Sequence, residues 1–345
     1  MQRILNFCLV PNHKGETIGK MVESCLLNWG MDNIFTLTVD NASSNDGAIR
    51  YLKKETMHWR DTILGHEFMH VRCCAHILNL VVKEALKDVH DSIVKIRNAV
   101  RYVRSSPARS QSFKACVEKL KIEHKGLVCL DVETRWNSKY KMLEVAEKFE
   151  KAFGRLEVDP NYVSYFDKSK NIGPPMKEDW DIARVFVKFL KLFYTVTLRF
   201  SCSVYVTSNA FFHELMALVD RLNTLMRSSD AYLSCMAIKM KKKLDKYWEN
   251  DANLNFVLFA AVVLDPRFKM GYVGFCFDEV YGEYKGRLMR DGVKETLYSL
   301  YAHYESMCFG VYSSSQNSDE LIVDDVEDNI VLSFQQKYSR HRKGI

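Results

Sequence analysis

Short apolar runs alternate with a helical pattern over the first forty residues. Residues 4–10 and 34–39 form such runs, and the second is rich in β-branched residues, which favours a buried strand. Between them, apolar residues from Ile18 to Trp29 recur at the spacing of one helix face. This order predicts a strand, a helix and a strand, which form a right-handed βαβ unit if both strands share a sheet.

A second helix and a third strand are predicted behind this unit. The polar stretch 41–46 is suited to begin a helix that runs to about Glu55, and residues 68–74 have the composition of a strand. From Ala75, apolar positions keep a helical period to about Ser105, with a break near Val89. The front of the chain is therefore predicted to be α/β.

The rest of the chain has a helical pattern almost throughout. The turn sequences Gly173-Pro174-Pro175 and Asp265-Pro266 cannot continue a helix. The apolar stretch 185–200 contains three basic residues and is shorter than the roughly 20 residues of a bilayer span, so we expect a buried helix and no membrane segment. Helices are predicted over residues 111–124, 136–153, 180–201, 208–226, 231–249 and 277–309.

Composition narrows the compartment and the class of partner. The chain has 345 residues, of which 47% are hydrophobic, enough for a sizeable core. Its net charge of +6 is compatible with a polyanionic partner but does not require one. Ten scattered cysteines and a beginning without the apolar run of a signal peptide indicate reduced thiols in an intracellular protein.

Three clusters carry candidate chemistry. Asp40 follows the second strand, where a carboxylate can hold a divalent metal ion, although capping the next helix is the commoner role. Cys73 and His76 have a Cys-x-x-His spacing, but no second pair lies at a finger-like interval, so a structural role at a strand-to-helix junction is favoured over zinc. Arg135 and Trp136 offer a phosphate contact and a stacking face for an unpaired base.

The alternative for the third cluster is purely structural. In that interpretation Trp136 packs at the start of its helix, and Asp131 or Glu133 pairs with Arg135. Basic residues along the preceding helical stretch can follow a phosphate backbone, and a solvated helix face is the commoner explanation. The candidates for phosphate contact there are Lys83, Arg97, Arg101 and Arg104.

Taken together, these clusters resemble the plant hAT transposases. The resemblance rests on Thr-Val-Asp-Asn-Ala at 38–42, Cys-Cys-Ala-His at 73–76 and Thr-Arg-Trp-Asn-Ser at 134–138. The domesticated relatives of the sleeper type, which carry a BED zinc finger, are the most similar. The family has an RNase H-like core interrupted by a helical insertion, and it cuts DNA with two aspartates and a glutamate that hold two metal ions.

The resemblance implies a role for each cluster. Asp40 matches the second catalytic aspartate, Cys73 and His76 match a Cys-x-x-His element beside the core, and Arg135 and Trp136 match the pair that handles the flipped base. The first aspartate, the Ser-Glu-Arg type motif of the C-terminal dimerisation segment and the BED finger have no counterpart in the sequence. One carboxylate cannot hold two metals, so Asp40 is expected to be a vestigial ligand.

We therefore expect a truncated or domesticated hAT-like protein that binds DNA in the nucleus. We do not expect it to perform strand transfer by itself, because it has one of the three carboxylates that the reaction needs. One alternative is a nuclease completed by another chain or by missing segments, and a metal cofactor, Mg²⁺ or Mn²⁺, is expected only in that case. The other alternative is a protein-interaction scaffold. DNA is the expected partner, with a second copy or a related transposase-like chain as a further one. The expected division is a partial RNase H-like α/β core at 1–106, a helical insertion region at 107–310, and a disordered acidic linker with a basic tail at 311–345.

Overall fold

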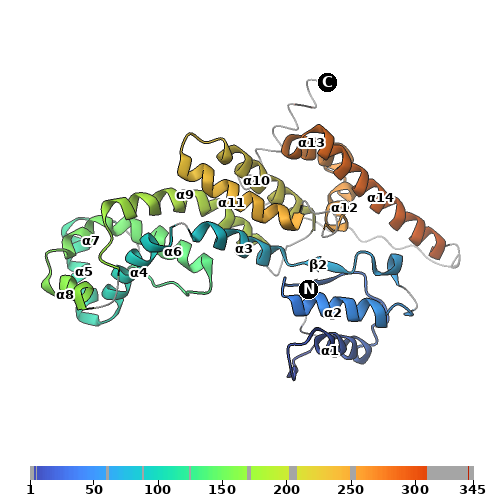
Figure 1. Ribbon diagram of the computed structural model, residues 1–345, viewed down its shortest axis with the longest axis horizontal. Coiled ribbons are helices and arrows are strands. Elements are labelled where there is room, and N and C mark those ends of the chain that lie inside the picture. The colour runs from blue at the N-terminus through green and yellow to red at the C-terminus, as the bar shows by residue number, and fades with distance from the viewer. Residues whose placement is uncertain are drawn as a thin grey trace. The chain divides into compact units, whose positions relative to one another are not determined.

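The chain is mostly helical, with one small sheet (Figure 1). The computed structural model describes residues 4, 6–59, 62–87, 89–123, 126–168, 172–201, 208–248, 254–308 and 341. It forms two compact units. Unit 1 comprises Met1–Ile77, Arg199–Ser234 and Leu244–Ile345, and unit 2 comprises Leu78–Leu198 and Cys235–Lys243.

Unit 1 begins with a helix and a parallel βαβ motif. Helix α1 (Gly15–Asn28) precedes strand β1 (Leu37–Val39), helix α2 (Ser43–Glu55), the 3₁₀ turn η1 (Ile63–His66) and strand β2 (His70–Arg72). The strands are parallel, with Leu37 opposite His70 and Val39 opposite Arg72. The crossover between them is α2, so the motif consists of the second and third predicted strands.

The first predicted strand was wrong. Residues 4 and 6–10 are not part of a strand, and the side chains of Ile4, Phe7 and Leu9 are 85%, 100% and 89% exposed. A short apolar run gains stability as a strand only when a neighbour completes its backbone hydrogen bonds and another layer covers its side chains. Neither condition is met for this run among the described residues, and the βαβ unit predicted from 4–10 and 34–39 is not formed.

Helices α1 and α2 pack closely because two glycines face each other. A Cβ on Gly15 would lie 2.7 Å from the Cα of Gly47, so a larger residue would force the helices apart. Under the pair lies a small apolar cluster. Its buried members are Leu26, Ile34, Leu52 and Met69.

The remaining helices of unit 1 pack around aromatic rings. They are α10 (Ser208–Met226), α12 (Val257–Leu264), α13 (Lys269–Tyr281) and α14 (Glu283–Cys308). The predicted helix 208–226 is confirmed with the same bounds, and the predicted turn at Asp265-Pro266 separates α12 from α13. The predicted helix 277–309 is instead two helices, because Gly282 takes φ 80° between them. The rings at the centre belong to Phe212, Phe259, Tyr272 and Phe277.

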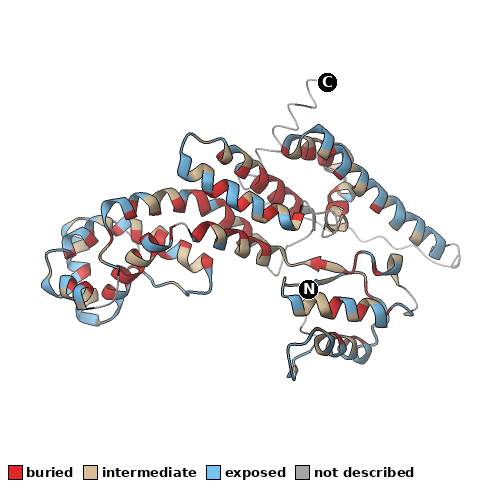
Figure 2. Cartoon of the chain, viewed as in Figure 1, coloured by how far each residue is buried: buried red, intermediate tan, exposed pale blue. Residues whose placement is uncertain are grey.

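Unit 2 consists of helices and the loops between them, with no strand in its described part. It contains most of α3 (Cys74–Leu86), α4 (His90–Arg104), α5 (Pro107–Lys119), α6 (Trp136–Ala146), η2 (Glu147–Phe149), α7 (Glu150–Leu156), α8 (Pro160–Lys168), most of α9 (Lys177–Phe200) and part of α11 (Ala231–Trp248). Buried residues lie along the sides of these helices that face one another (Figure 2). Phe113 packs on Phe153, and Phe153 stacks on Trp180, so α5, α7 and α9 share one core.

Two further expectations concern membranes and the tail. Among the described residues, no helix combines the length and the apolar character that crossing a bilayer requires. The predicted disordered segment 311–345 lies outside the described residues except for His341.

Candidate functional site

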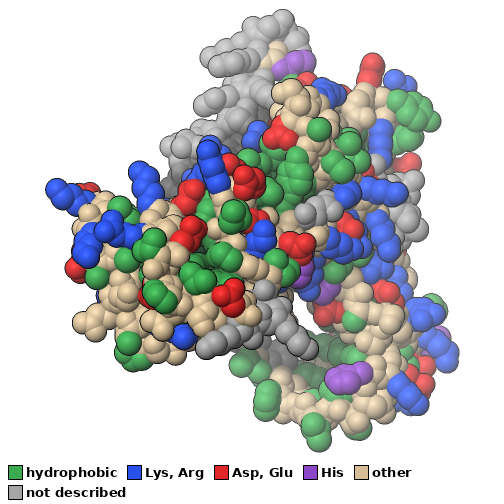
Figure 3. Space-filling view, turned by 60° about the vertical axis from the view of Figure 1, so that its left-hand side comes forward, with side chains coloured by type: hydrophobic (Ala, Val, Ile, Leu, Met, Phe, Trp, Pro, Cys, Tyr) green, Lys and Arg blue, Asp and Glu red, His purple; other side chains and the backbone are tan. Residues whose placement is uncertain are grey.

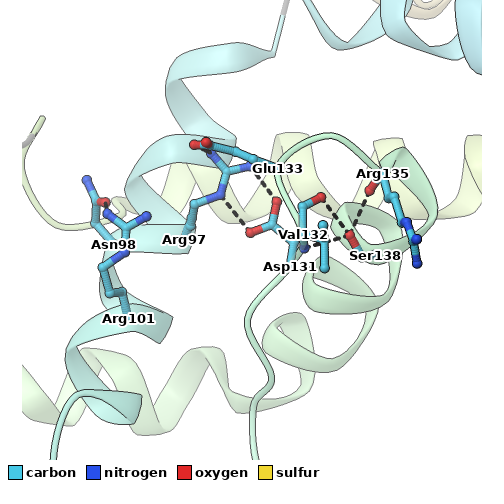
Figure 4. A network of polar contacts seen from close by, with 8 residues as sticks. All are labelled: Arg97, Asn98, Arg101, Asp131, Val132, Glu133, Arg135 and Ser138. Carbon is cyan, nitrogen blue, oxygen red and sulfur yellow. Dashed lines mark hydrogen bonds and ion pairs between the residues drawn. The ribbon is translucent and has the colours of Figure 1, made fainter. Parts of the chain in front are cut away.

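The segment around Arg135 is anchored to α4 by a buried ion pair (Figure 4). Arg97 donates from Nε to Asp131 Oδ1 at 2.8 Å and from Nη2 to Oδ2 at 2.6 Å. The two side chains are only 7% and 2% exposed. A two-point guanidinium–carboxylate pair shielded from water fixes both distance and orientation, so Asp131 holds the loop before α6 against α4.

A second set of contacts closes the loop into a turn. The hydroxyl oxygen of Ser138 accepts from the Val132 N–H at 2.8 Å, and the hydroxyl lies 2.9 Å from Val132 O and 2.7 Å from Arg135 O. The backbone N–H of Arg135 also donates to Val132 O at 2.9 Å. We call residues 131–138 the fixed turn, because its ends are tied to each other and to α4.

Arg135 lies at the exposed corner of the fixed turn. It is the residue before the first turn of α6, with φ −110° and ψ 107°, and its side chain is exposed. The predicted pairing of Arg135 with Asp131 or Glu133 is wrong, because both carboxylates approach Arg97, Glu133 at 3.8 Å from Nη1. Within the described part of the chain, no acidic side chain forms an ion pair with Arg135, which leaves its guanidinium to solvent.

The side chain of Trp136 is part of the apolar packing between α6 and α9. Its side chain is 3% exposed, and its ring meets Tyr194 of α9 edge to face at 6.5 Å. Tyr194 in turn stacks on Tyr140 at 4.6 Å. The ring therefore has no open face for an unpaired base, and the helix-start packing alternative is the one that the geometry supports.

The four basic candidates on α3 and α4 divide into two kinds. Arg97 is buried and paired with Asp131, so its predicted contact with phosphate does not fit the structure. Lys83, Arg101 and Arg104 are exposed, and Arg101 lies near its neighbour Asn98, at 3.4 Å from Nη1 to Oδ1. Only the exposed three and Arg135 can meet a phosphate backbone without breaking a buried pair.

Sequence reasoning missed two lysines next to the fixed turn. Burial and the nearby charge of Arg97 lower the pKa of the half-buried Lys139. Lys141 lies over the ring of Tyr194 at 4.8 Å and donates to Glu144 at 2.9 Å, and this bond raises the pKa of the lysine. The Lys141–Glu144 spacing of three residues in a predicted helix was a signal for the second contact.

Asp40 lies after β1, as predicted, in an exposed loop. Its Oδ1 accepts from the Ala42 N–H at 2.9 Å and from the Asn45 side-chain amide at 2.6 Å. The guanidinium of Arg72 donates to the side-chain oxygen of Asn41 at 3.3 Å and lies 3.4 Å from the carboxylate of Asp46, in the first turn of α2. No group of three His, Cys, Asp or Glu residues that could hold a metal ion occurs in the described ranges. A metal-binding role of Asp40 therefore remains a prediction.

Cys73 and His76 lie half-buried where β2 joins α3. The backbone of Cys73 makes the junction, since its N–H donates to Val39 O at 2.8 Å and its carbonyl accepts from the Ile77 N–H at 3.0 Å. The structural role expected of the pair remains a prediction for the His76 ring.

On the face drawn in Figure 3, charge alone does not mark a binding surface. On the face that Figure 3 shows, lysine and arginine side chains lie in several groups separated by acidic and apolar side chains. The fixed turn is therefore distinguished by its geometry, an exposed arginine on a rigid support, rather than by charge density.

Three family models match consecutive parts of the chain. They are the ZBED1 RNase-like domain over residues 1–68, the ZBED1 RNase-like helical domain over 71–188, and the hAT-like transposase RNase-H fold over 209–304. The first range falls in unit 1, the third falls in unit 1 except for residues 235–243, and most of the second falls in unit 2.

Curated relatives from plants match the same regions. The zinc finger BED domain-containing protein RICESLEEPER 2 of Oryza sativa subsp. japonica is 33% identical over 307 residues, which are 88% of this chain and 41% of the relative. The putative AC transposase of Zea mays is 28% identical over 339 residues, 97% of this chain and 40% of the relative. The DAYSLEEPER protein of Arabidopsis thaliana is 28% identical over 294 residues, with coverages of 85% and 40%. The chain thus spans about two fifths of the length of the curated relatives it matches.

Proposed function

Because this chain belongs to the hAT-type transposase family, together with its relatives of the BED zinc finger type, we propose that it binds DNA through the fixed turn and the exposed basic residues of α3 and α4. One observation carries the proposal. Arg135 projects into solvent from a turn that the Arg97–Asp131 pair ties to α4 and that Ser138 closes on Val132. Because the backbone of the turn is already fixed, only the Arg135 side chain has to be ordered when it contacts a phosphate.

In this proposal the residues have different tasks. Arg135, Lys83, Arg101 and Arg104 contact the phosphate backbone, because they are exposed. Arg97 acts through Asp131 and holds the turn. Trp136 anchors α6 to α9 and positions Arg135 next to it.

The test is an affinity measurement across a salt series. Replacing Arg135 by alanine should weaken binding to duplex and hairpin DNA and reduce the slope of log affinity against log salt by about 1. Arg155→Ala is the matched control, since Arg155 is an exposed arginine of unit 2 outside the turn. Equal loss in both variants would mean that only net charge matters, and no binding of the unaltered chain at low salt would end the proposal.

The second candidate function is metal-dependent cleavage of DNA, favoured only by the position of Asp40 at the carboxyl end of β1. We place it behind binding, because the side chain of Asp40 already serves the loop and Arg72 lies beside the neighbouring donors. Incubation with DNA and Mg²⁺ or Mn²⁺ compares the wild type with Asp40→Ala. Cleavage that requires Asp40 would favour this candidate, and identical nicking by both proteins would exclude Asp40 chemistry.

We also propose that unit 1 is the RNase H-like core and that unit 2 is a helical insertion within it. The support is that the match over 1–68 falls in unit 1 and the match over 209–304 falls mostly there, while the helical match lies mostly in unit 2. The boundary between residues 106 and 107 stays a prediction. A nuclear location, a domesticated non-cutting role and assembly with a second copy or a related chain follow from the family and are proposed on that basis alone.

A further inference from the structure

A serine directly before a proline lies between α4 and α5. Of the six prolines in the chain, only Pro107 follows a hydroxyl residue, because the others follow valine, aspartate, glycine, proline and aspartate. The tetrapeptide is Ser106-Pro107-Ala108-Arg109, so a basic residue stands three positions after the serine. Proline-directed protein kinases accept a serine with this arrangement of proline and cation.

The conformation and exposure of the segment suit such an enzyme. Ser106 is extended, with φ −154° and ψ 154°, and Ser105, Pro107 and Ala108 are exposed. The hydroxyl oxygen of Ser106 is held only by the N–H of Arg109 at 3.3 Å, a bond at the long end of the normal range. Ser106 itself is half-buried between the end of α4 and the first turn of α5, so a kinase has to open that turn, but the hydroxyl loses only one long hydrogen bond when it does.

The surroundings of the serine are basic. Residues 101–110 contain Arg101, Arg104 and Arg109 and no acidic residue. The guanidinium of Arg109 lies over the ring of Tyr102 at 4.3 Å and donates to Ser105 Oγ at 2.6 Å, so it already faces the hydroxyl side of the junction. Arginines in this arrangement are the groups that a phosphoserine binds.

We propose that Ser106 is a phosphorylation site. We propose further that its phosphoryl group lowers the affinity for DNA of the fixed turn and the exposed basic residues of α3 and α4. The serine oxygen attacks the γ-phosphorus of ATP, the new O–P bond replaces the bond to the ADP oxygen, and the hydroxyl proton passes to the base of the kinase. ADP leaves, and the protein carries a phosphate of nearly two negative charges. The regulatory half of this inference rests on the proposed DNA binding, whereas the modification itself does not.

The physical effect is a local loss of positive charge. Arg101 and Arg104 stand in the last turn of α4, directly before Ser106. A dianion there neutralises charges that would otherwise meet DNA phosphates, and we expect roughly a 10-fold loss of affinity at low salt. The same dianion lies at the N-terminus of α5, where negative charge is favourable, so the fold should not suffer.

The first experiment tests the modification. The full chain is incubated with a proline-directed serine kinase and ATP, and the modified residue is located by peptide mass spectrometry. Ser106→Ala and Pro107→Ala should lose the label, while Ser105→Ala should keep it. Labelling of Ser106→Ala at the wild-type level, or no labelling of the folded wild type, would overturn the assignment.

The second experiment tests the effect on DNA with variants that keep the helix cap. Aspartate and asparagine both cap a helix well, so Ser106→Asp and Ser106→Asn differ mainly by one charge. The aspartate variant should bind DNA severalfold more weakly than the asparagine variant, and the phosphorylated wild type more weakly still. Equal affinity of all three would refute the regulatory effect, whereas failure of even the unmodified chain to bind would refute the proposed function and leave the labelling result intact.

Discussion

Two loops that the sequence singled out for chemistry are built in opposite ways. In the loop after β1, the side chain of Asp40 makes hydrogen bonds that span at most five residues, to the Ala42 N–H and the Asn45 amide, and these bonds are exposed. The fixed turn is held by Arg97 and Asp131, which are 34 residues apart and buried. Each loop depends on an aspartate. The side chain of Asp40 binds only groups close to it in the sequence, whereas the side chain of Asp131 connects the loop before α6 to α4.

The difference teaches where an aspartate matters energetically. Exposed hydrogen bonds replace bonds to water and contribute about 0.5 kcal/mol each, the low end of the usual range. A buried ion pair adds little over an apolar pair of equal volume, but removing one partner leaves a charge without water or counter-ion. We therefore expect the two loops to respond very differently to loss of their aspartates.

The largest effect is expected for Asp131→Ala. The change leaves the Arg97 guanidinium buried without its two-point partner, and should lower the free energy of unfolding by about 3–5 kcal/mol. Urea denaturation followed by circular dichroism measures it. The matched control is Glu133→Ala, since Glu133 is 77% exposed and 3.8 Å from the same guanidinium.

For the control we expect a loss of about 0.5 kcal/mol or less. If the two variants lose similar stability, Glu133 and not the buried pair holds the turn, and the contrast between the two loops disappears.

Trp136→Ala sharpens the comparison from the apolar side. The ring is buried against Tyr194, so its removal leaves a cavity between α6 and α9 and should cost about 3 kcal/mol. Trp136→Phe keeps most of the ring and should retain most of the stability. DNA binding measured on the folded phenylalanine variant then separates packing from base stacking, because a stacking role needs the face that the structure covers.

A strong loss of hairpin binding in Trp136→Phe at unchanged stability would support the interpretation in which Trp136 stacks directly on an unpaired base. Unchanged binding is the result that the buried position of the ring predicts.

Unit 1 offers a buried titratable group that extends the comparison to pH. His213 of α10 lies 2.9 Å from the Tyr272 hydroxyl and against the ring of Phe268, and burial lowers the pKa of its imidazole to about 4. In the unfolded chain the pKa is about 6.5, so between pH 6.5 and 4 the unfolded state binds more protons and stability falls as the pH falls. From pH 6.5 to pH 5 the expected loss is about 2 kcal/mol.

Urea denaturation at several pH values measures this slope, and His213→Gln should flatten it. A variant with the wild-type slope would assign the pH dependence to other groups.

Much of the helical architecture was accessible from the sequence. The helix 208–226 has the bounds that its apolar period predicted. The turn at Asp265-Pro266 was also predictable, because the proline ring cannot continue a helix. Local patterns are sufficient there because packing and propensity agree. The run 4–10 shows the opposite case, since its apolar composition says nothing about whether a partner strand is present.

The candidate site was predictable in its residues but not in its contacts. Arg135 was singled out, yet the sequence offered Asp131 and Glu133 as its partners because they are close along the chain. The actual partner of both is Arg97, which only the packing of α4 beside the turn brings near. Pairing across 34 residues leaves no local pattern, so residue type and spacing could not distinguish the arginine that anchors from the arginine that is exposed.

The smallest effect is expected for Asp40→Ala. The change removes two hydrogen bonds from an exposed loop, to the Ala42 N–H and to the Asn45 amide, and should lower the free energy of unfolding by about 1 kcal/mol. Asp40→Asn retains an acceptor at Oδ1 and should cost less, because the loop bonds need an oxygen rather than a charge. Urea denaturation compares both with the wild type in metal-free buffer and again with added Mg²⁺. If Mg²⁺ stabilises the wild type and not Asp40→Asn, the carboxylate of Asp40 binds the ion. Asp40 would then be a metal ligand, and its role would not be limited to organising the loop.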